Sequence, residues 1–191
     1  DGLKGLAFER FSPEPILSPT PGGYDNDASY SPTVIENESS VVMIYTGHCY
    51  TNCTKGPGVR LLAAMSPDGV HWSKRSEPVL EASSIISWMD EGVGESHILK
   101  GPDGMFYLFF TGIHEDQRVI GIARGASPFG PWQINPDPIV LPTPGTFDSP
   151  ETLAPHVRVQ GNVVRMWYMG LNPITEKYAI GYAESPWPLY K

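Results

Sequence analysis

A stretch of about 25 residues occurs three times in variant form, and this internal repeat constrains the fold more than any other feature of the sequence. Each copy has an acidic segment, a short strand, a turn and an aromatic strand that ends in glycine. The copies begin at Tyr24, Trp88 and Phe147, about 60 residues apart, a spacing that fits one four-stranded blade of a β-propeller.

Turn residues and aromatic runs place the strands within each repeat. In the middle copy, Gly101-Pro102-Asp103-Gly104 is a turn between two expected strands, Ser96–Lys100 and Met105–Thr111. Third strands are expected at Val59–Met65, Val119–Arg124 and Tyr178–Glu184. The 191 residues include 20 glycines and 20 prolines, and this turn-rich composition favours an all-β fold.

The N-terminal segment resembles the strands that end the first two repeats, whereas the third repeat lacks such a strand. We therefore expect Phe8–Leu17 to pair beside Tyr178–Glu184 and to close the last blade, which removes two open sheet edges. The predicted fold is a single β-propeller domain, residues 1–191, whose four-stranded blades comprise residues 24–82, 83–145, and 146–191 with 6–17.

Three blades are fewer than the usual four to eight. The sequence leaves three arrangements open: a small ring, two chains that join as a homodimer into six blades, or one part of a larger propeller.

The repeats resemble the five-bladed propeller glycoside hydrolases of families 43 and 32 and their relatives, over nearly the whole chain and about three blades of the five. The resemblance is carried by the acidic segment before each inner strand and by the aromatic second strand that ends in Thr-Gly. A third carrier is Ser66-Pro67-Asp68-Gly69 followed by Trp72, which is also similar to the Asp-box of sialidases. We interpret Asp68 as a structural turn residue.

The resemblance implies a central pocket that receives one carboxylate from each of several blades. Family 43 inverts, with a base Asp, an acid Glu and a third Asp that tunes the acid; family 32 retains, with an Asp nucleophile and a Glu acid. Both place an Asp directly before a Pro in the first blade, where this chain has Ser31, and the third repeat has Ala154. Only Glu95, in Gly94-Glu95-Ser96-His97, resembles the acid motif.

Cleavage of a glycosidic bond usually takes two carboxyl groups, one of which stays protonated near neutral pH. We expect Glu95 to be the acid, since a charge at the head of an apolar strand is costly unless it has a function. Asp25 or Asp148, which recur at one repeat position, is the expected base, with a structural turn role as the alternative. The substrate-binding candidates are Trp88, Asp90, Glu151, His97 and His156. The alternative for each of these residues, and for Asp27 and Glu91, is a structural position in a solvated loop or in the core.

Two functions follow from this pattern. The first is a glycoside hydrolase that acts on an oligosaccharide or polysaccharide, and the second is a lectin-like propeller that binds carbohydrate without catalysis. A purely structural propeller is a third alternative. No cofactor or metal is expected, although His97 and His156 leave a cation at the ring centre open.

Charge and cysteine usage narrow the partners and the compartment. A formal net charge of −8 argues against a nucleic-acid partner, and the sequence contains no apolar run long enough to span a membrane. Cys49 and Cys53 form either a loop disulfide or two free thiols, whereas a zinc site is disfavoured because only His48 lies nearby. A secreted or periplasmic location is expected, with a cytoplasmic one as the alternative.

Overall fold

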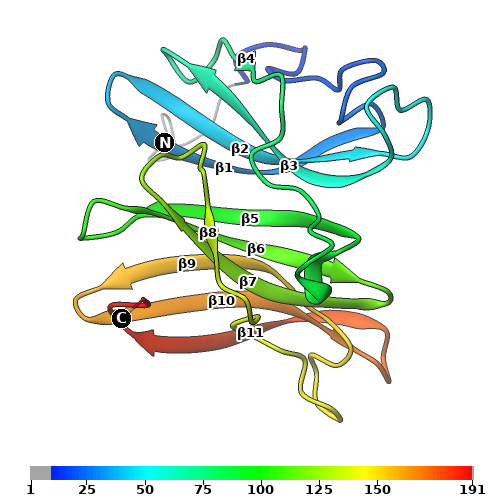
Figure 1. Ribbon diagram of the computed structural model, residues 1–191, viewed down its shortest axis with the longest axis vertical. Helices are drawn as coiled ribbons and strands as arrows, with labels where there is room; N and C mark the ends of the chain where they lie inside the picture. The colour runs from blue at the N-terminus through cyan, green and yellow to red at the C-terminus, as the bar shows by residue number, and fades with distance from the viewer. Residues whose placement is uncertain (1–9, 191) are drawn as a thin grey trace, which may run out of the picture.

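Three antiparallel meanders, stacked in layers, make up residues 10–190, the part of the chain that the computed structural model describes (Figure 1). We call the meanders blades I, II and III. Blade I contains β1 (Ala28–Asn37), β2 (Ser40–Cys49), β3 (Gly58–Ser66) and β4 (Ser73–Lys74). Blade II contains β5 (Gly92–Lys100), β6 (Phe106–His114), β7 (Gln117–Gly125) and β8 (Gln133–Ile134). Blade III contains β9 (Thr152–Gln160), β10 (Val163–Asn172) and β11 (Lys177–Pro186). The all-β expectation is confirmed.

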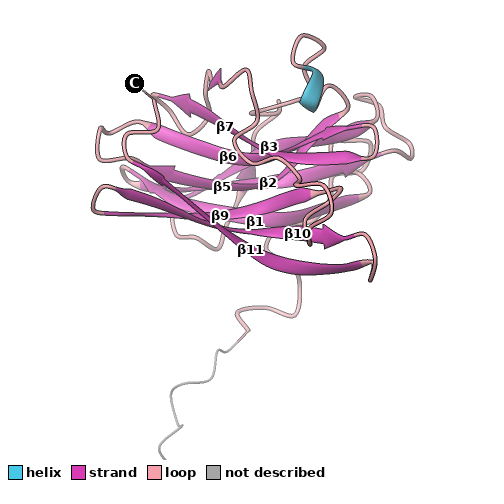
Figure 2. Ribbon diagram, turned by 90° about the horizontal axis from the view of Figure 1, so that it is seen from below, coloured by secondary structure: helices cyan, strands magenta, loops and turns pink. Residues whose placement is uncertain are grey.

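Helical structure in residues 10–190 is limited to the 3-10 turn η1 (Ser87–Met89), which lies at one margin of the strands in Figure 2. Among these residues no helix is long and apolar enough to cross a membrane. Blades I and II are linked by one parallel residue pair, Val59 of β3 and Gly92 of β5.

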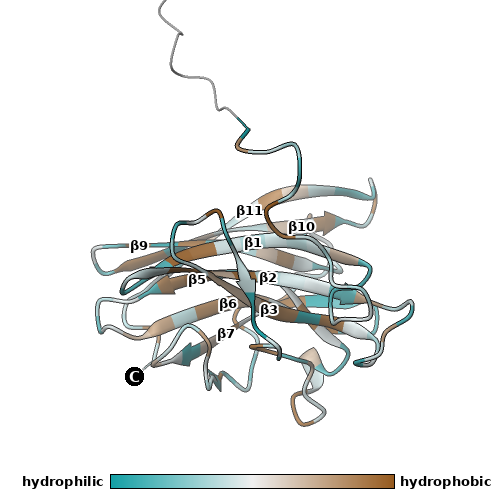
Figure 3. Cartoon of the chain, turned by 90° about the horizontal axis from the view of Figure 1, so that it is seen from above, coloured by the Kyte–Doolittle hydropathy of each residue, from teal (hydrophilic) through white to brown (hydrophobic). Residues whose placement is uncertain are grey.

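The apolar side chains of the strands fill two layers between neighbouring blades. Alternate residues of β6 point to opposite faces of the blade, so that Phe106, Leu108 and Phe110 face blade I. Tyr107 and Phe109 face blade III, where they meet Val164, Met166 and Tyr168. In Figure 3 the brown, apolar stretches accordingly follow the strands. No core cluster of the described residues joins blade I to blade III, so the blades form an open arc.

In blades II and III the glycine at the end of the aromatic strand makes room for the aromatic residue that begins the repeat. The Trp88 ring lies against β6 and β7, and a Cβ on Gly112 or Gly121 would come within 2.4 or 2.1 Å of that ring. In blade III a Cβ on Gly170 or Gly181 would come within 2.9 or 2.8 Å of the Phe147 ring. The aromatic–glycine pattern of these two blades is therefore a packing pattern, whereas in blade I a Cβ on Gly47 would meet Leu62 and Asp25.

All three inner strands share an irregularity that the sequence did not reveal. Ser31, Glu95 and Ala154 occupy the same repeat position, and their φ angles are +49°, +32° and +51°, in the left-handed region. Thr46 Oγ1 of blade I accepts a hydrogen bond of 2.9 Å from the Glu95 amide of blade II. Thr111 of blade II accepts one of 3.0 Å from the Ala154 amide of blade III. The Thr of each Thr-Gly pair thus fixes the bulge of the next blade.

The expected closure of blade III by the N-terminal segment is not found. Residues 10–17 form no strand, and β11 pairs only with β10; Phe8 and Glu9 lie outside the described residues. Leu17 instead packs on the outer face of blade I, and the Lys74 ammonium donates a hydrogen bond of 2.5 Å to the Ser18 carbonyl. Pro13 and Pro15 carry no amide hydrogen for a strand ladder, which gives the physical reason.

Candidate functional site

A cavity of about 430 Å³ lies where the three inner strands converge. Its lining comes from residues 31–34 of β1, 95–97 of β5 and 154–156 of β9. Each strand therefore contributes its bulge, which turns the backbone away from the regular ladder and points a side chain into the cavity. Of the three bulge positions, only the one in blade II has an ionisable side chain, Glu95.

The carboxyl group of Glu95 is partly enclosed and incompletely paired. Its Oε2 atom is buried and has no hydrogen-bond partner within residues 10–190. Burial raises the pKa of the Glu95 carboxyl, and the charge of Glu151 adds to this, against the opposing effects of the Thr111 hydroxyl and the Arg118 guanidinium. Such a group keeps its proton to higher pH than an exposed glutamate, which is what a proton donor requires.

A charged group from blade III lies beside it. Glu151 is almost fully buried and forms an ion pair with Arg118 of β7, while the Tyr178 hydroxyl donates a hydrogen bond of 3.1 Å to Glu151 Oε2. Tyr30 of blade I completes the group: burial and the charge of Glu95 raise its pKa to about 12, so the phenol is neutral at pH 7. Residues of all three blades thus surround the Glu95 carboxyl.

The two histidines of the cavity face each other across the gap between blades II and III. The rings of His97 and His156 lie 4.4 Å apart, edge to face. Burial, followed by the proximity of His156 and Arg158, lowers the pKa of His97 to about 4, so this ring is neutral at pH 7. Within residues 10–190 no group of three or more His, Cys, Asp or Glu side chains is arranged to hold a metal ion.

Asp25 and Asp148, the expected bases, are not among the residues that line the cavity. Both are buried in the loop before an inner strand, where each accepts a hydrogen bond from an amide five residues earlier, Thr20 or Thr143. Each also accepts the hydroxyl of a second-strand tyrosine, at 3.3 Å for Tyr45 and 2.9 Å for Tyr168. These contacts correspond to the structural role that the sequence left as the alternative.

Trp88 and Asp90 also lie outside the cavity lining. The Trp88 ring stacks on Phe110 within the core between blades I and II, and its indole donates a hydrogen bond of 2.8 Å to the Pro136 carbonyl. Asp90 is exposed and contacts the His114 ring at 2.7 Å. The Trp88 ring is thus occupied by packing within the core, and its expected role in substrate binding stays a prediction.

Three residues near Glu95 were missed by the sequence reasoning: Tyr30, Arg118 and Tyr178. Arg118 and Tyr178 lie at the starts of β7 and β11, and Tyr30 directly precedes the bulge of β1. Neither Arg118 nor Tyr178 recurs between repeats. Only their proximity to Glu95 and Glu151 identifies them. The one available signal was the position of Tyr30 next to the Ser-Pro pair of the first repeat.

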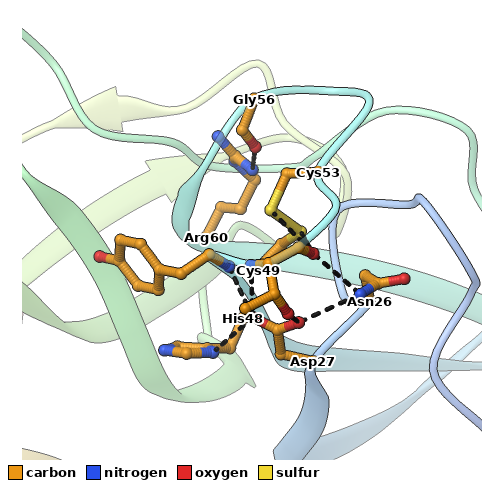
Figure 4. A network of polar contacts seen from close by, with 9 residues as sticks. Asn26, Asp27, His48, Cys49, Cys53, Gly56 and Arg60 are labelled. Carbon is orange, nitrogen blue, oxygen red and sulfur yellow. Dashed lines mark hydrogen bonds and ion pairs between the residues drawn. A yellow bond between two sulfur atoms is a disulfide. The ribbon is translucent and has the colours of Figure 1, made fainter.

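The loop between β2 and β3, residues 50–57, is fixed by a disulfide and a carboxylate (Figure 4). Cys49 and Cys53 are bonded, with their Cα atoms 5.9 Å apart, which decides between the alternatives that the sequence left open. Asp27 accepts hydrogen bonds from the Tyr50 and Thr51 amides at 2.6 and 3.0 Å. The hydrogen bond from the Thr51 hydroxyl, followed by those from the amides, holds the Asp27 pKa well below its usual range, so the carboxylate is ionised.

Several known structures with a similar fold are described as glycoside hydrolases. A family 117 glycoside hydrolase of Zobellia galactanivorans matches with a TM-score of 0.69 and 18% identity, over 82% of this chain and 52% of that one. A thermostable family 43 glycoside hydrolase matches with a TM-score of 0.65 and 16% identity, over 87% of this chain and 53% of that one. A third match comes from family 130, a family of mannoside phosphorylases that contains glycoside hydrolases targeting β-1,2-mannosidic linkages. It has a TM-score of 0.63 and 14% identity, over 90% of this chain and 57% of that one.

These likenesses confirm the resemblance to five-bladed propeller glycoside hydrolases and establish the fold as that of a β-propeller. The chain spans about half the length of the solved chains it matches. No family model and no curated protein sequence matches it.

Proposed function

We propose that the protein is a glycoside hydrolase acting on an oligosaccharide or polysaccharide, with Glu95 as the proton donor. The observation that carries this proposal is the position of Glu95 in the cavity lining, together with a buried Oε2 that has no hydrogen-bond partner among the described residues. A buried acceptor without a partner is costly, and a substrate hydroxyl or glycosidic oxygen would supply the partner.

The neighbours of Glu95 suit a two-carboxylate reaction. Its raised pKa favours the protonated form of Glu95, the form that donates a proton to the leaving glycosidic oxygen. Glu151 is the second carboxylate: Arg118 and Tyr178 hold it in place, and its charge favours the protonated form of Glu95. In this role Glu151 either activates the attacking water or stabilises positive charge at the sugar ring.

The second candidate function is carbohydrate binding without catalysis. It is favoured by Ser31 and Ala154, because the bulges of blades I and III present no carboxylate where the family motif has one. In that case Glu95 and the histidine pair would bind sugar hydroxyls only, and carbohydrate remains the ligand under both proposals.

The Cys49–Cys53 disulfide supports a secreted or periplasmic location, since disulfides persist mainly in oxidising compartments.

Glu95→Gln is the decisive variant, because the amide keeps the shape of the side chain and cannot donate the proton to a leaving group. General acid catalysis is worth about 10²–10⁴-fold in rate. We therefore expect turnover of 4-nitrophenyl glycosides or of oligosaccharides to fall by that factor. The matched control is Glu36→Gln on exposed β1 surface, which should keep parental turnover.

The stability of Glu95→Gln separates loss of chemistry from loss of fold. An acid whose pKa is raised in the folded state contributes stability below its unfolded pKa and loses it as the pH rises through the folded value. At pH 7 the neutral glutamine should therefore be at least as stable as the parent in thermal unfolding. Unchanged turnover in Glu95→Gln would refute the assigned acid, and sugar binding by a parent that cleaves no glycoside would favour the second function.

A further inference from the structure

The blade II-facing side of blade I carries a row of aromatic side chains that leads away from Glu95. On β2, Val42 and Ile44 pack into the core toward blade II, and the period of two puts Thr46 and His48 on the same face. The hydrogen bond from the Glu95 amide to Thr46 Oγ1 confirms this orientation.

The register of β1 and β2 adds a second aromatic residue to this row. Tyr30 of β1 lies directly opposite Thr46, so that both side chains project from the same face of the sheet. Tyr50 follows β2 two positions after His48, and its ring meets the His48 ring edge to face at 4.8 Å. The row therefore runs from Tyr30, beside Glu95, through His48 to Tyr50, the exposed first residue of the loop between β2 and β3.

Tyr50 is exposed and at the same time held in place. Tyr50 is 58% exposed, so its ring is open to a ligand from solvent. Its amide donates a 2.6 Å hydrogen bond to Asp27, and the neighbouring disulfide joins Cys49 to Cys53. The loop that carries it, residues 50–57, is longer than the corresponding loops of blades II and III, residues 115–116 and 173–176.

From this geometry we propose that Tyr30, His48 and Tyr50 form a subsite for a second sugar unit of an oligosaccharide, with the Tyr50 ring as the stacking platform. The proposal rests on the proposed carbohydrate function and deepens it. Aromatic rings present a flat apolar face to the C–H side of a pyranose or furanose, and a ring fixed before binding loses little conformational entropy. The disulfide is the device that fixes it.

Affinity for sugars of different length tests the subsite. In the Glu95→Gln background, binding of xylo-, manno- and arabino-oligosaccharides and of the corresponding methyl glycosides is measured by titration calorimetry. Tyr50→Ala should weaken binding of the trisaccharide that binds best by about tenfold, while the methyl glycoside of the same sugar binds within about twofold of the parent. Tyr50→Phe retains the ring and should keep parental affinity.

Control variants test whether the effect of Tyr50→Ala is specific to the stacking platform. Phe11→Ala removes an aromatic residue that is 71% exposed, in the segment before blade I, and should leave both affinities unchanged. The pair Cys49→Ser with Cys53→Ser should weaken trisaccharide binding in the same direction as Tyr50→Ala, because the loop loses its anchor. Circular dichroism verifies the fold of each variant.

The outcomes distinguish this inference from the proposed function. If Tyr50→Ala binds the trisaccharide as the parent does, the subsite is refuted, even where Glu95→Gln abolishes turnover. If the parent neither binds nor cleaves any of the probes, the carbohydrate function and the subsite are both refuted.

Discussion

Two aspartates at one repeat position, Asp25 and Asp148, have the same environment in two blades. Each closes the loop before an inner strand by bonding to a backbone amide and to a second-strand tyrosine. Asp25 differs in one respect, because the Lys74 ammonium forms an ion pair with it. Burial alone would raise the pKa of Asp25, but the hydrogen bonds from Lys74, Ser29 and the Thr20 amide outweigh burial and lower it.

Asp25→Asn should therefore destabilise the protein at pH 7 by about 2–4 kcal/mol, since it leaves the partly buried Lys74 without its counter-ion. The midpoint of urea denaturation measures this loss. Because the pKa of Asp25 is lowered on folding, its contribution is present above its ordinary value of 3.8 and disappears as the pH falls through the folded value. The difference between parent and variant should shrink accordingly in acid.

Asp148→Asn provides the comparison and should cost less, because the hydrogen bonds of Asp148 come from uncharged groups. A loss of turnover in either variant at undiminished stability would contradict the structural interpretation and support the base that the sequence predicted.

The bulge of the inner strand is the element that positions the site. It gives Glu95 a left-handed backbone conformation within β5, and a threonine from the preceding blade satisfies the amide that the irregular ladder leaves free. The same arrangement at Thr111 and Ala154 serves blade III. The contact between blades I and II through Thr46 thus also orients Glu95.

Thr46→Val should remove this support without a change in side-chain shape. The Glu95 amide is left without an acceptor, which costs about 1–3 kcal/mol, and turnover should fall because the carboxyl moves. Thermal unfolding and glycoside turnover are measured side by side. Thr46→Ser, which retains the hydroxyl, should recover most of both, whereas parental stability in Thr46→Val would show that the amide finds another partner.

At the scale of the whole molecule, the arc of three blades ends in a face that no described residue covers. On β11, Tyr178, Ile180 and Tyr182 share one face, and Ile180 is 71% exposed. Trp167 lies opposite Tyr182 on β10 and extends this apolar surface. In addition, β11 is an edge strand with free backbone groups. A propeller covers such faces and edges with a neighbouring blade.

We therefore expect two copies of the chain to associate at micromolar concentration and to complete a larger ring. Light scattering should give a mass of twice the 21.0 kDa of one chain. Ile180→Glu places a charge on the exposed face and should return the mass to that of a single chain, while its circular dichroism spectrum stays parental. A parent that scatters as a single chain would contradict the expected dimer.

Much of the fold was determined by the sequence alone. The threefold repeat, the glycine and proline turns and the aromatic runs predicted the strands of each blade and the resemblance to propeller hydrolases, because these signals are local and recur along the chain. The same reasoning singled out Glu95 and left the Cys49–Cys53 pair open between two states. It placed the N-terminal segment on blade III, since similarity to an outer strand does not reveal which blade a proline-rich segment contacts.

Only the tertiary structure decided which side chains meet. Glu151, Arg118 and Tyr178 come together from two blades, whereas Asp25 and Asp148 turn into their own loops. The bulge and the orientation of β2 then put an aromatic row beside Glu95. The physical reason is that repeat periodicity records the path of the backbone within each blade. The partners of a buried charge depend on contacts between blades, and residues about 30 to 60 positions apart in sequence leave no local signal of those contacts.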